Sequence, residues 1–280
     1  MVRWGTRTIL LVCLALTGAG FGLLPFAGNR TLAAPRVTEW APPGTRPLPD
    51  AEAAALVTPM AEIAPQGAEQ NSYVPSRAQL AAFRAARNSA GQTAVEFNPL
   101  LAYVTGRPGD LVDPSTDDLI QWVSHKWGIP TNLIRAQMFV ESRWRQDFLG
   151  DRTVLGPEWY ALYPPQARVP GGGEAYQSMG IAQVKWTPDG AVGAGTEPLR
   201  WLSTAFNLDY YAATLRYYYD GACNWCGPDY SPAQGWKSAG AWYSPEPWDN
   251  EGAQAYIREL QQAVGDRAWI QLGDWVVDPG

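Results

Sequence analysis

Histidine, cysteine and positive charge are all scarce in this sequence. His125 is the only histidine in 280 residues, which excludes every mechanism that needs two histidines, including HExxH zinc hydrolysis. The 21 basic residues are outnumbered by 27 acidic ones, so binding to nucleic acid through phosphate neutralisation is not expected. Aromatic residues are abundant, with 14 Trp and 13 Tyr, and the hydrophobic fraction of 46% is enough for a sizeable folded core.

The three cysteines predict a disulfide rather than a metal or redox site. Cys13 lies in the N-terminal segment, and the other two, Cys223 and Cys226, form a CxxC spacing that follows a helical pattern. A zinc site needs four ligands, which one distant histidine cannot complete. We therefore expect Cys223 and Cys226 to form a structural disulfide, and we expect no metal site and no cofactor.

The first 34 residues have the layout of an export signal. Arg3 and Arg7 precede an apolar run, and the segment ends in small residues at Ala33 and Ala34. This pattern predicts a signal peptide at 1–34, and an uncleaved N-terminal anchor that tethers the protein to the membrane is the alternative. Either form places the protein outside the cytoplasm, where it is secreted, periplasmic or associated with the cell wall.

Composition divides the rest of the chain into three parts. Residues 35–75 contain eight prolines and few branched apolar residues, which predicts an extended linker that is dispensable for activity. Residues 76–114 begin with a short amphipathic helix, with Leu80 and Phe83 on one face, and continue as a connecting segment of mixed character. Residues 115–280 are predicted to form the folded domain.

Helix signals dominate residues 115–280, and no convincing series of alternating strands is present. A capping box at Ser115-Thr-Asp-Asp118 starts a helix that ends at Gly128, and Pro130 starts a second helix that runs to about Trp144. Two more helices are predicted at 199–219 and at 251–264, the last with Ala255, Ile257 and Leu260 as apolar positions. The predicted fold class is mostly α.

Glu141 stands out because it projects from the apolar stripe of the second helix. It follows Met138 by three residues and Ile134 by seven, so it shares their face. Burial raises the pKa of a carboxyl group, and a raised pKa makes a glutamate a general acid near neutral pH. The alternative is a solvated carboxylate at a frayed helix end.

Four motif elements around Glu141 resemble a known family. They are Ile129-Pro-Thr-Asn-Leu-Ile-Arg-Ala with Val140-Glu-Ser142, then Ser178-Met-Gly-Ile-Ala-Gln183, then Asn207 in Ala205-Phe-Asn-Leu-Asp, and Tyr243 in Gly240-Ala-Trp-Tyr-Ser. In this order they resemble the soluble lytic transglycosylase domain of bacterial cell-wall enzymes, which is related to goose-type lysozymes. The matched stretch, 129–243, is well under half of the chain.

The resemblance implies a lysozyme-like helical domain at 115–280 that acts on the glycan strands of peptidoglycan. Glu141 would protonate the glycosidic oxygen between N-acetylmuramic acid and N-acetylglucosamine, and would then deprotonate the C6 hydroxyl that closes a 1,6-anhydro ring. The positions implied for substrate binding are Ser142, Ser178, Met179, Gly180, Gln183, Asn207 and Tyr243. We expect a monomer whose partner is the glycan.

The sequence departs from the family in two ways. An insertion at 152–176 lengthens the gap between Glu141 and Ser178, and Ala182 and Ser244 replace residues that the family favours at those positions. Both departures concern how the substrate is positioned.

Two other functions remain open from the sequence. A hydrolytic muramidase or chitinase-like glycosidase needs a second carboxylate. No spacing singles out one of the four acidic residues near the insertion, Asp147, Asp151, Glu158 and Glu174, and each fits a solvated loop charge. The second alternative is a catalytically silent module that binds the cell wall.

The aromatic residues fit a carbohydrate groove, since indoles and phenols stack on sugar rings. We expect two or three of six tryptophans to line a cleft, and the Tyr217-Tyr-Tyr219 run to serve helix packing. The six are Trp186, Trp201, Trp225, Trp236, Trp242 and Trp248.

Overall fold

The computed structural model describes residues 37–60, 63, 68–90, 98–223, 226, 230–244 and 250–274. All of them belong to one compact unit, Ala34–Gly280. The predicted signal segment at 1–34 lies outside the described residues. Within the described ranges, no helix has the length and the apolar character that crossing a bilayer requires.

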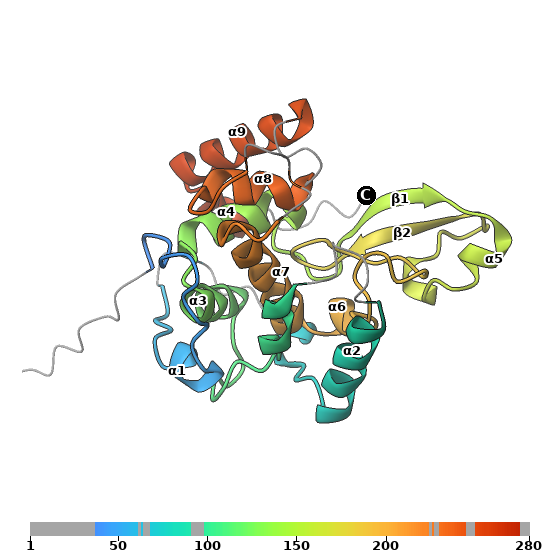
Figure 1. The fold of residues 1–280 in the computed structure, drawn as a ribbon, viewed down its shortest axis with the longest axis horizontal. Helices are drawn as coiled ribbons and strands as arrows, with labels where there is room; N and C mark the ends of the chain where they lie inside the picture. Colours follow the sequence, from blue (N-terminus) through green and yellow to red (C-terminus); the bar gives the residue numbers. More distant parts are fainter. Residues whose placement is uncertain are drawn as a thin grey trace, which may run out of the picture. The chain divides into compact units, whose positions relative to one another are not determined.

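The unit is mostly helical, as the sequence predicted, and it carries one small sheet (Figure 1). The N-terminal elements, with 3₁₀ helices written η, are α1 (Asp50–Ala54), η1 (Glu69–Ser72), α2 (Arg77–Ala90), η2 (Pro99–Tyr103), α3 (Thr116–Trp127) and α4 (Thr131–Ser142). The sheet region holds β1 (Leu149–Val154), α5 (Pro157–Tyr160), η3 (Pro165–Ala167), β2 (Glu174–Met179) and β3 (Val184–Lys185). The C-terminal elements are α6 (Leu199–Leu202), α7 (Thr204–Tyr219), α8 (Gly235–Tyr243), α9 (Glu251–Asp266) and η4 (Ala268–Asp274).

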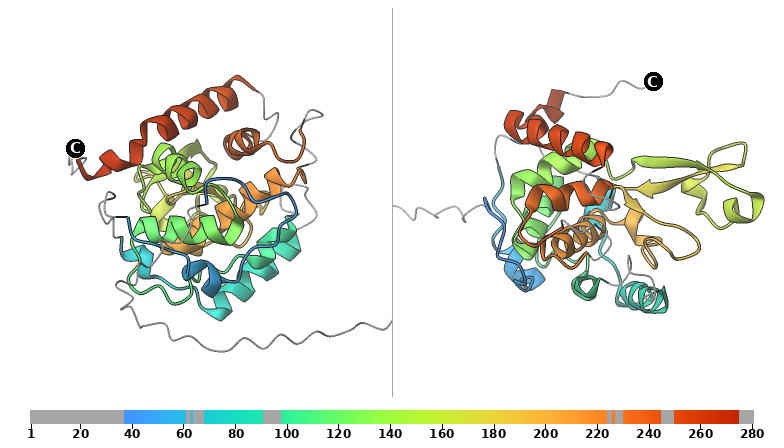
Figure 2. Two further views of the ribbon diagram at one scale, coloured as in Figure 1. Left: turned by 90° about the vertical axis from the view of Figure 1, so that its left-hand side faces the viewer. Right: turned by 45° about the horizontal axis from the view of Figure 1, so that its top comes forward.

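Helix α7 lies inside the helical body. It packs against α3, α8 and η2, while α4 packs against α9 (Figures 1 and 2). The predicted ends of α3 are confirmed: Ser115 and Asp118 form a reciprocal capping box, and Gly128 adopts the left-handed C-cap conformation. The Gly128 cap lies in the turn that leads from α3 into α4, the helix that carries Glu141.

The single helix predicted at 199–219 is in fact two helices, so that prediction was wrong. Ser203 interrupts it with an extended backbone, and its hydroxyl accepts a hydrogen bond from the N–H of Phe206 at 3.2 Å. A serine in this position is a favourable N-cap for α7. The continuous apolar and aromatic character on both sides of Ser203 hid the break in the sequence.

The region of the predicted insertion forms an antiparallel hairpin, which the sequence did not predict. Strands β1 and β2 pair from Leu149 opposite Met179 to Val154 opposite Glu174, and the short β3 pairs with β2. The hairpin extends from the helical body, with α5 and η3 between its strands (Figures 1 and 2). A small core of its own, centred on Tyr163, Ala167, Ala175 and Met179, stabilises it.

The extended linker predicted at 35–75 is not what the structure shows for the described residues of that range. Residues 37–58 lie along helix α3 and the turn between α3 and α4, and we call them the N-terminal strap. The N–H of Leu48 donates to the carbonyl of Lys126 at 2.8 Å, and the N–H of Ala41 donates to the carbonyl of Gly128 at 2.8 Å. Ala53 in α1 is fully buried. The prolines of this segment therefore belong to a packed part of the fold and not to an extended linker.

A buried ion network holds the strap to the helical body. The Lys126 ammonium contacts Asp50 of the strap at 2.7 Å and Asp209 of α7 at 2.8 Å. Asp209 is fully buried and also accepts hydrogen bonds from the Trp127 indole at 2.7 Å and the Thr105 N–H at 2.8 Å. Because buried charges are costly without partners, the strap is part of the stable unit.

Residues 76–114 also belong to this unit. The predicted face of α2 is confirmed, since Leu80 and Phe83 are buried, and the Phe83 ring meets Phe206 edge to face at 5.2 Å. One cluster of buried apolar residues runs from Ala53 to Leu272. The boundary predicted before Ser115 therefore cuts through a continuous core.

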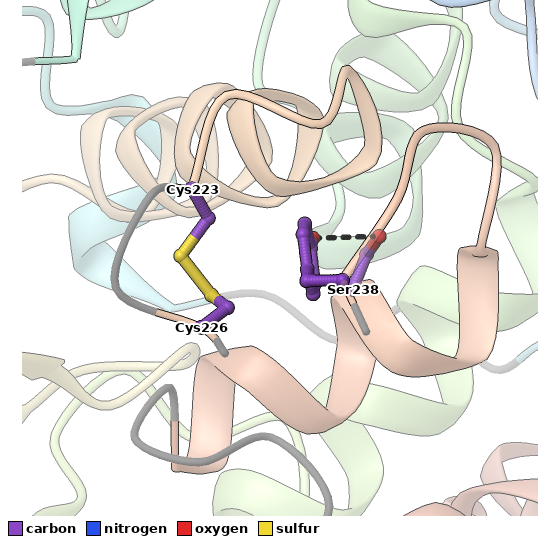
Figure 3. The surroundings of a disulfide bond; sticks show 4 residues. Cys223, Cys226 and Ser238 are labelled. Carbon is purple, nitrogen blue, oxygen red and sulfur yellow. Dashed lines mark hydrogen bonds between the residues drawn. A yellow bond between two sulfur atoms is a disulfide. The ribbon is translucent and has the colours of Figure 1, made fainter. Parts of the chain in front are cut away.

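The predicted disulfide between Cys223 and Cys226 is confirmed (Figure 3). Both cysteines are buried in a small cluster with Tyr217 and Tyr218. Beside it, the Tyr230 and Ser238 hydroxyls lie 3.4 Å apart. The bond closes a very short loop, so it constrains the unfolded chain only slightly.

Replacing both cysteines by serine should lower the free energy of unfolding by only about 2 kcal/mol, since loop-closure entropy grows with loop length. Urea unfolding of the oxidised protein and the double variant measures this difference. The reduced wild-type protein is the control and should unfold near the variant. A loss above about 4 kcal/mol would show that the disulfide holds more than its own loop.

Candidate active site

A cavity of about 630 Å³ opens where the sheet meets the helical body, and Glu141 lines it. Helices α7 and α8 contribute mainly aromatic side chains, and the sheet region contributes mainly polar ones. A sugar ring suits such a lining, because its apolar face stacks on aromatic rings while its hydroxyls need hydrogen bonds. The aromatic residues are Tyr210, Tyr217, Tyr218, Trp242 and Tyr243, and the residues from the sheet region are Gly150, Asp151, Ser178, Gln183 and Lys185.

Glu141 lies in the last turn of α4, where its partly buried side chain reaches the cavity. Burial raises the pKa of this carboxyl from 4.5 to about 7, and the negative charges of Asp151 and Glu259 act in the same direction. A hydrogen bond from Tyr256 opposes the shift but is outweighed. A carboxyl group with this pKa holds a transferable proton near neutral pH, as a general acid must.

Tyr256 of α9 fixes the orientation of this acid. Its hydroxyl donates to Glu141 Oε1, which leaves Oε2 to carry the transferable proton. Burial and the nearby Glu141 charge raise the pKa of the Tyr256 phenol well above its usual range, so the phenol remains a donor. The Tyr243 ring stacks on Tyr256 with centroids 5.0 Å apart and covers it on the cavity side of α8.

A second hydrogen bond lies behind this pair. The Tyr211 hydroxyl donates to Gln137 Oε1 at 2.6 Å. Gln137 is one turn before Glu141 on α4, and both Gln137 and Tyr211 are fully buried. The turn of α4 that precedes Glu141 is therefore bonded to α7, while the carboxyl itself is bonded to α9.

The predicted apolar positions Ile257 and Leu260 of α9 are confirmed, but Tyr256, between Ala255 and Ile257, was not predicted to be buried. Ala255, predicted to be apolar and inward, is exposed, and the buried face consists of Ala253, Tyr256, Ile257, Leu260 and Ala263. A tyrosine on the buried face of a helix needs an acceptor for its hydroxyl. This requirement was the sequence signal that could have identified Tyr256 as a site residue.

Replacing Tyr256 by phenylalanine should raise the upper pH limit of activity. The variant loses the hydrogen bond from Tyr256 that stabilises ionised Glu141, so the pKa of the carboxyl should rise by about one unit. The rate should also fall, because the carboxyl is no longer oriented. Rate profiles against pH measure both effects, with Tyr230→Phe, outside the cavity lining, as the control. An unchanged upper limit would contradict the role given to this hydrogen bond.

Four of the predicted site residues line the cavity: Glu141, Ser178, Gln183 and Tyr243. The Ser178 hydroxyl donates to Asp151 at 2.7 Å. The Gln183 amide donates to the carbonyls of Gly180 at 2.8 Å and Phe148 at 3.2 Å, and these bonds hold it beside β1. Tyr243 is 57% exposed, so its free ring edge is available to a ligand.

The other four, Ser142, Met179, Gly180 and Asn207, are not among the residues that line the cavity. The Ser142 hydroxyl donates to the carbonyl of Ile181 at 2.8 Å, which ties the end of α4 to the turn that follows β2. The buried Asn207 side chain accepts from the N–H of Ala182 at 2.9 Å and donates to the carbonyl of Met179 at 3.0 Å. Their contacts indicate that these residues hold the turn.

Gly180 has a physical reason to be glycine. Its φ is +87°, and a Cβ at this position would lie 2.2 Å from the Asn207 amide nitrogen. Any side chain would push Asn207 away from the turn. Close packing of the backbone, Gly180 and the Asn207 amide thus holds the turn between Ser178 and Gln183, two residues that line the same cavity as Glu141.

Only one of the four candidate second carboxylates reaches the cavity. Asp151 of β1 lines it, whereas Asp147 is exposed and pairs with Arg145 at 3.1 Å. Glu174 pairs with Arg152, and Glu158 is exposed on α5. The interpretation as solvated charges therefore fits Asp147, Glu158 and Glu174, but Asp151 shares a cavity with Glu141.

Among the described tryptophans, Trp242 lines the cavity. Trp186 and Trp201 pack against the small core of the hairpin, and Trp236 is 40% exposed on α8. Trp225 and Trp248 lie outside the described residues. Tyrosines supply more of the aromatic lining than predicted, since Tyr217 and Tyr218 serve both helix packing and the cavity.

Comparison with protein-family models, with curated proteins and with solved structures found no match to this chain.

Proposed function

We propose that this protein is a lytic transglycosylase that cleaves the β-1,4 bond between N-acetylmuramic acid and N-acetylglucosamine in peptidoglycan. The observation that carries the proposal is Glu141, a carboxyl group with a pKa of about 7 in a cavity lined by aromatic and polar side chains. The ordered motif elements add support, because Ser142 and Asn207 hold the turn after β2, and Ser178, Gln183 and Tyr243 line the same cavity as Glu141. The proposal requires export of the chain, which its N-terminal segment predicts.

Glu141 serves both steps of the proposed reaction. Its Oε2 proton passes to the glycosidic oxygen as the bond to C1 of the muramic acid breaks, and an oxocarbenium-like centre forms. The ionised carboxylate then accepts the proton of the C6 hydroxyl as that oxygen attacks C1. Tyr256 holds Oε1 throughout, so the carboxyl keeps one orientation for donation and for acceptance.

A hydrolytic muramidase is the second candidate, and the position of Asp151 favours it. Ordinary glycosidases use two carboxylates, one as acid and the other as base or nucleophile. Asp151 and Glu141 line the same cavity, so water could replace the C6 hydroxyl as the attacking group. The two candidates share the first step and differ in the product.

Digestion of purified peptidoglycan sacculi tests the proposal. We expect soluble muropeptides whose muramic acid ends are 1,6-anhydro rings, each lighter by one water than a hydrolysed end. Mass spectrometry distinguishes the two kinds of end. Products with hydrolysed ends alone would identify the muramidase, and sacculi left intact by the folded protein would refute both candidates.

A further inference from the structure

The hairpin continues beyond the cavity, and the proposed reaction gives its outer part no role. We propose that one face of the hairpin binds the glycan strand where the strand leaves the cavity, with Tyr176 as the residue on which a sugar ring stacks. The ligand is the glycan of the proposed function, on which this inference rests, but the sugars bound here are not the ones that are cleaved. The site lies within the insertion at 152–176, where the sequence departs from the family it resembles.

The two faces of the hairpin differ, because successive side chains of a strand point to opposite faces. Ala175 and Met179 belong to the small core that stabilises the hairpin. Gly150 and Ser178 pair with each other, and both line the cavity. Asp151 departs from the alternation, since its φ is +53° and its carboxylate accepts a hydrogen bond from the Ser178 hydroxyl at 2.7 Å. The face opposite the small core therefore borders the cavity.

This face continues outward from the cavity along both strands. Arg152 pairs with Tyr176 and, further out, Val154 pairs with Glu174, and we call these four residues the hairpin tract. The register places the tract on the same face as Ser178, and the strand rises about 13 Å from Ser178 to Glu174, which is longer than one sugar ring. The hairpin extends away from the helical body (Figures 1 and 2). A glycan strand that leaves the cavity on this side therefore meets the tract next.

The tract is open to solvent and has the chemistry of a sugar-binding surface. Val154 is 79% exposed, Arg152 is exposed, and Tyr176 and Glu174 are half-buried. Arg152 donates to Glu174 Oε2 through two guanidinium nitrogens, at 3.0 Å from Nε. An aromatic ring stacks on the apolar face of a sugar, while a guanidinium and a carboxylate donate to and accept from its hydroxyls. Tyr176, Arg152 and Glu174 supply all three groups side by side.

The size of the cavity and the charge of the tract favour a glycan as the occupant. A cavity of about 630 Å³ holds only a short stretch of a glycan strand, so the rest of the strand lies outside it. Arg152 and Glu174 neutralise each other, which suits an uncharged sugar chain better than a strongly charged partner. The tract is also continuous with the cavity through Ser178.

Binding of fluorescently labelled glycan tests the inference. The Glu141→Gln protein, which should bind without cleaving, is titrated with long glycan strands freed of peptides and with a tetrasaccharide of the same glycan, and fluorescence anisotropy gives each Kd. Adding Tyr176→Ala should raise the Kd for long strands by at least about threefold, because the stacked ring is lost. The Kd for the tetrasaccharide, which the cavity binds, should not change. Tyr176→Phe keeps the ring and should restore the affinity for long strands.

Arg152→Ala is a second variant that leaves the Tyr176 ring in place. It breaks only an exposed ion pair, which contributes little to stability, and it should raise the Kd for long strands by about twofold or more. Trp159→Ala is the matched control, since Trp159 is also an exposed aromatic residue of the hairpin but belongs to α5, outside the paired strands. It should leave both Kd values unchanged.

Three results would overturn the inference: no binding of long strands, an unchanged Kd for long strands in Tyr176→Ala and Arg152→Ala, or an equal rise for the tetrasaccharide. An equal effect of Trp159→Ala would also contradict it, because the binding would then not be specific to this face. Long strands that bind through Tyr176 but are not cleaved by wild-type protein would support the inference and refute the proposed function. Cleavage that proceeds without any contribution of the tract to binding would leave the proposed function standing alone.

Discussion

Replacing Glu141 by glutamine should lower the rate of glycan cleavage by at least about 100-fold while the fold stays intact. General acid catalysis contributes roughly 10²–10⁴-fold, and an amide has no proton of suitable acidity to give. Glutamine has nearly the same shape, and its oxygen can still accept the hydrogen bond from Tyr256. The assay is release of soluble muropeptides from sacculi. More than about a tenth of the wild-type rate would refute the assignment of the acid.

The same variant should also change how stability depends on pH. The pKa of Glu141 is about 7 in the folded protein and 4.5 when unperturbed, so the folded state binds the proton more tightly. The stability that this group provides is fully present below about pH 4.5 and is lost as the pH rises through about 7.

Glutamine removes this dependence, because it does not ionise. We therefore expect Glu141→Gln to be more stable than wild type at pH 8, by about 1–3 kcal/mol, with a smaller difference at pH 5. Urea unfolding at the two pH values measures the difference, and Glu158→Gln, an exposed position, is the control. Equal pH dependence in wild type and Glu141→Gln would show that burial does not raise this pKa.

Removing residues 1–75 should destabilise the protein strongly. A chain that begins at residue 76 loses the N-terminal strap, its backbone hydrogen bonds to the α3–α4 turn and the Asp50 partner of buried Lys126. Breaking a buried ion pair from one side typically costs about 3–5 kcal/mol, which lowers the melting temperature of a unit this size by roughly 10 °C. Thermal unfolding followed by circular dichroism measures the shift.

Removing only residues 1–36 is the matched control for this truncation, since the strap remains, and its melting temperature should match that of the intact chain. Asp50→Asn should fall between the two, because Lys126 keeps Asp209. A chain starting at residue 76 that melts like the control would support the dispensable linker that the composition predicted.

Local sequence signals predicted the helices well, but contacts between distant segments could not be predicted from the sequence. Ser115, Gly128 and Pro130 mark helix ends through chemistry that acts over a few residues, and the structure confirms them. The strap looked like a linker because prolines and few branched residues suggest an unpacked chain. Its attachment depends instead on backbone hydrogen bonds and on Lys126, about 80 residues further along the chain.

The candidate site also combines residues that local sequence patterns predicted with residues that only long-range contacts bring together. Glu141 was predictable because its spacing from Met138 places a carboxylate on an apolar face. Tyr256 and Asp151 come from a distant helix and an unpredicted hairpin, so no spacing in the sequence connects them with Glu141. Of the motif residues, Asn207 and Gly180 shape the turn, a role that only the packed structure separates from contact with a ligand.

The central claim is that Glu141 is a protonated acid near neutral pH, and infrared titration of its carboxyl group tests it most directly. The carbonyl stretch that is lost in Glu141→Gln should disappear from wild type with a midpoint near pH 7, where the burial of Glu141 places its pKa. The upper limb of the cleavage rate should share this midpoint. A carboxyl that titrates near its usual 4.5 would contradict the account, since Glu141 would then have no proton to give at neutral pH.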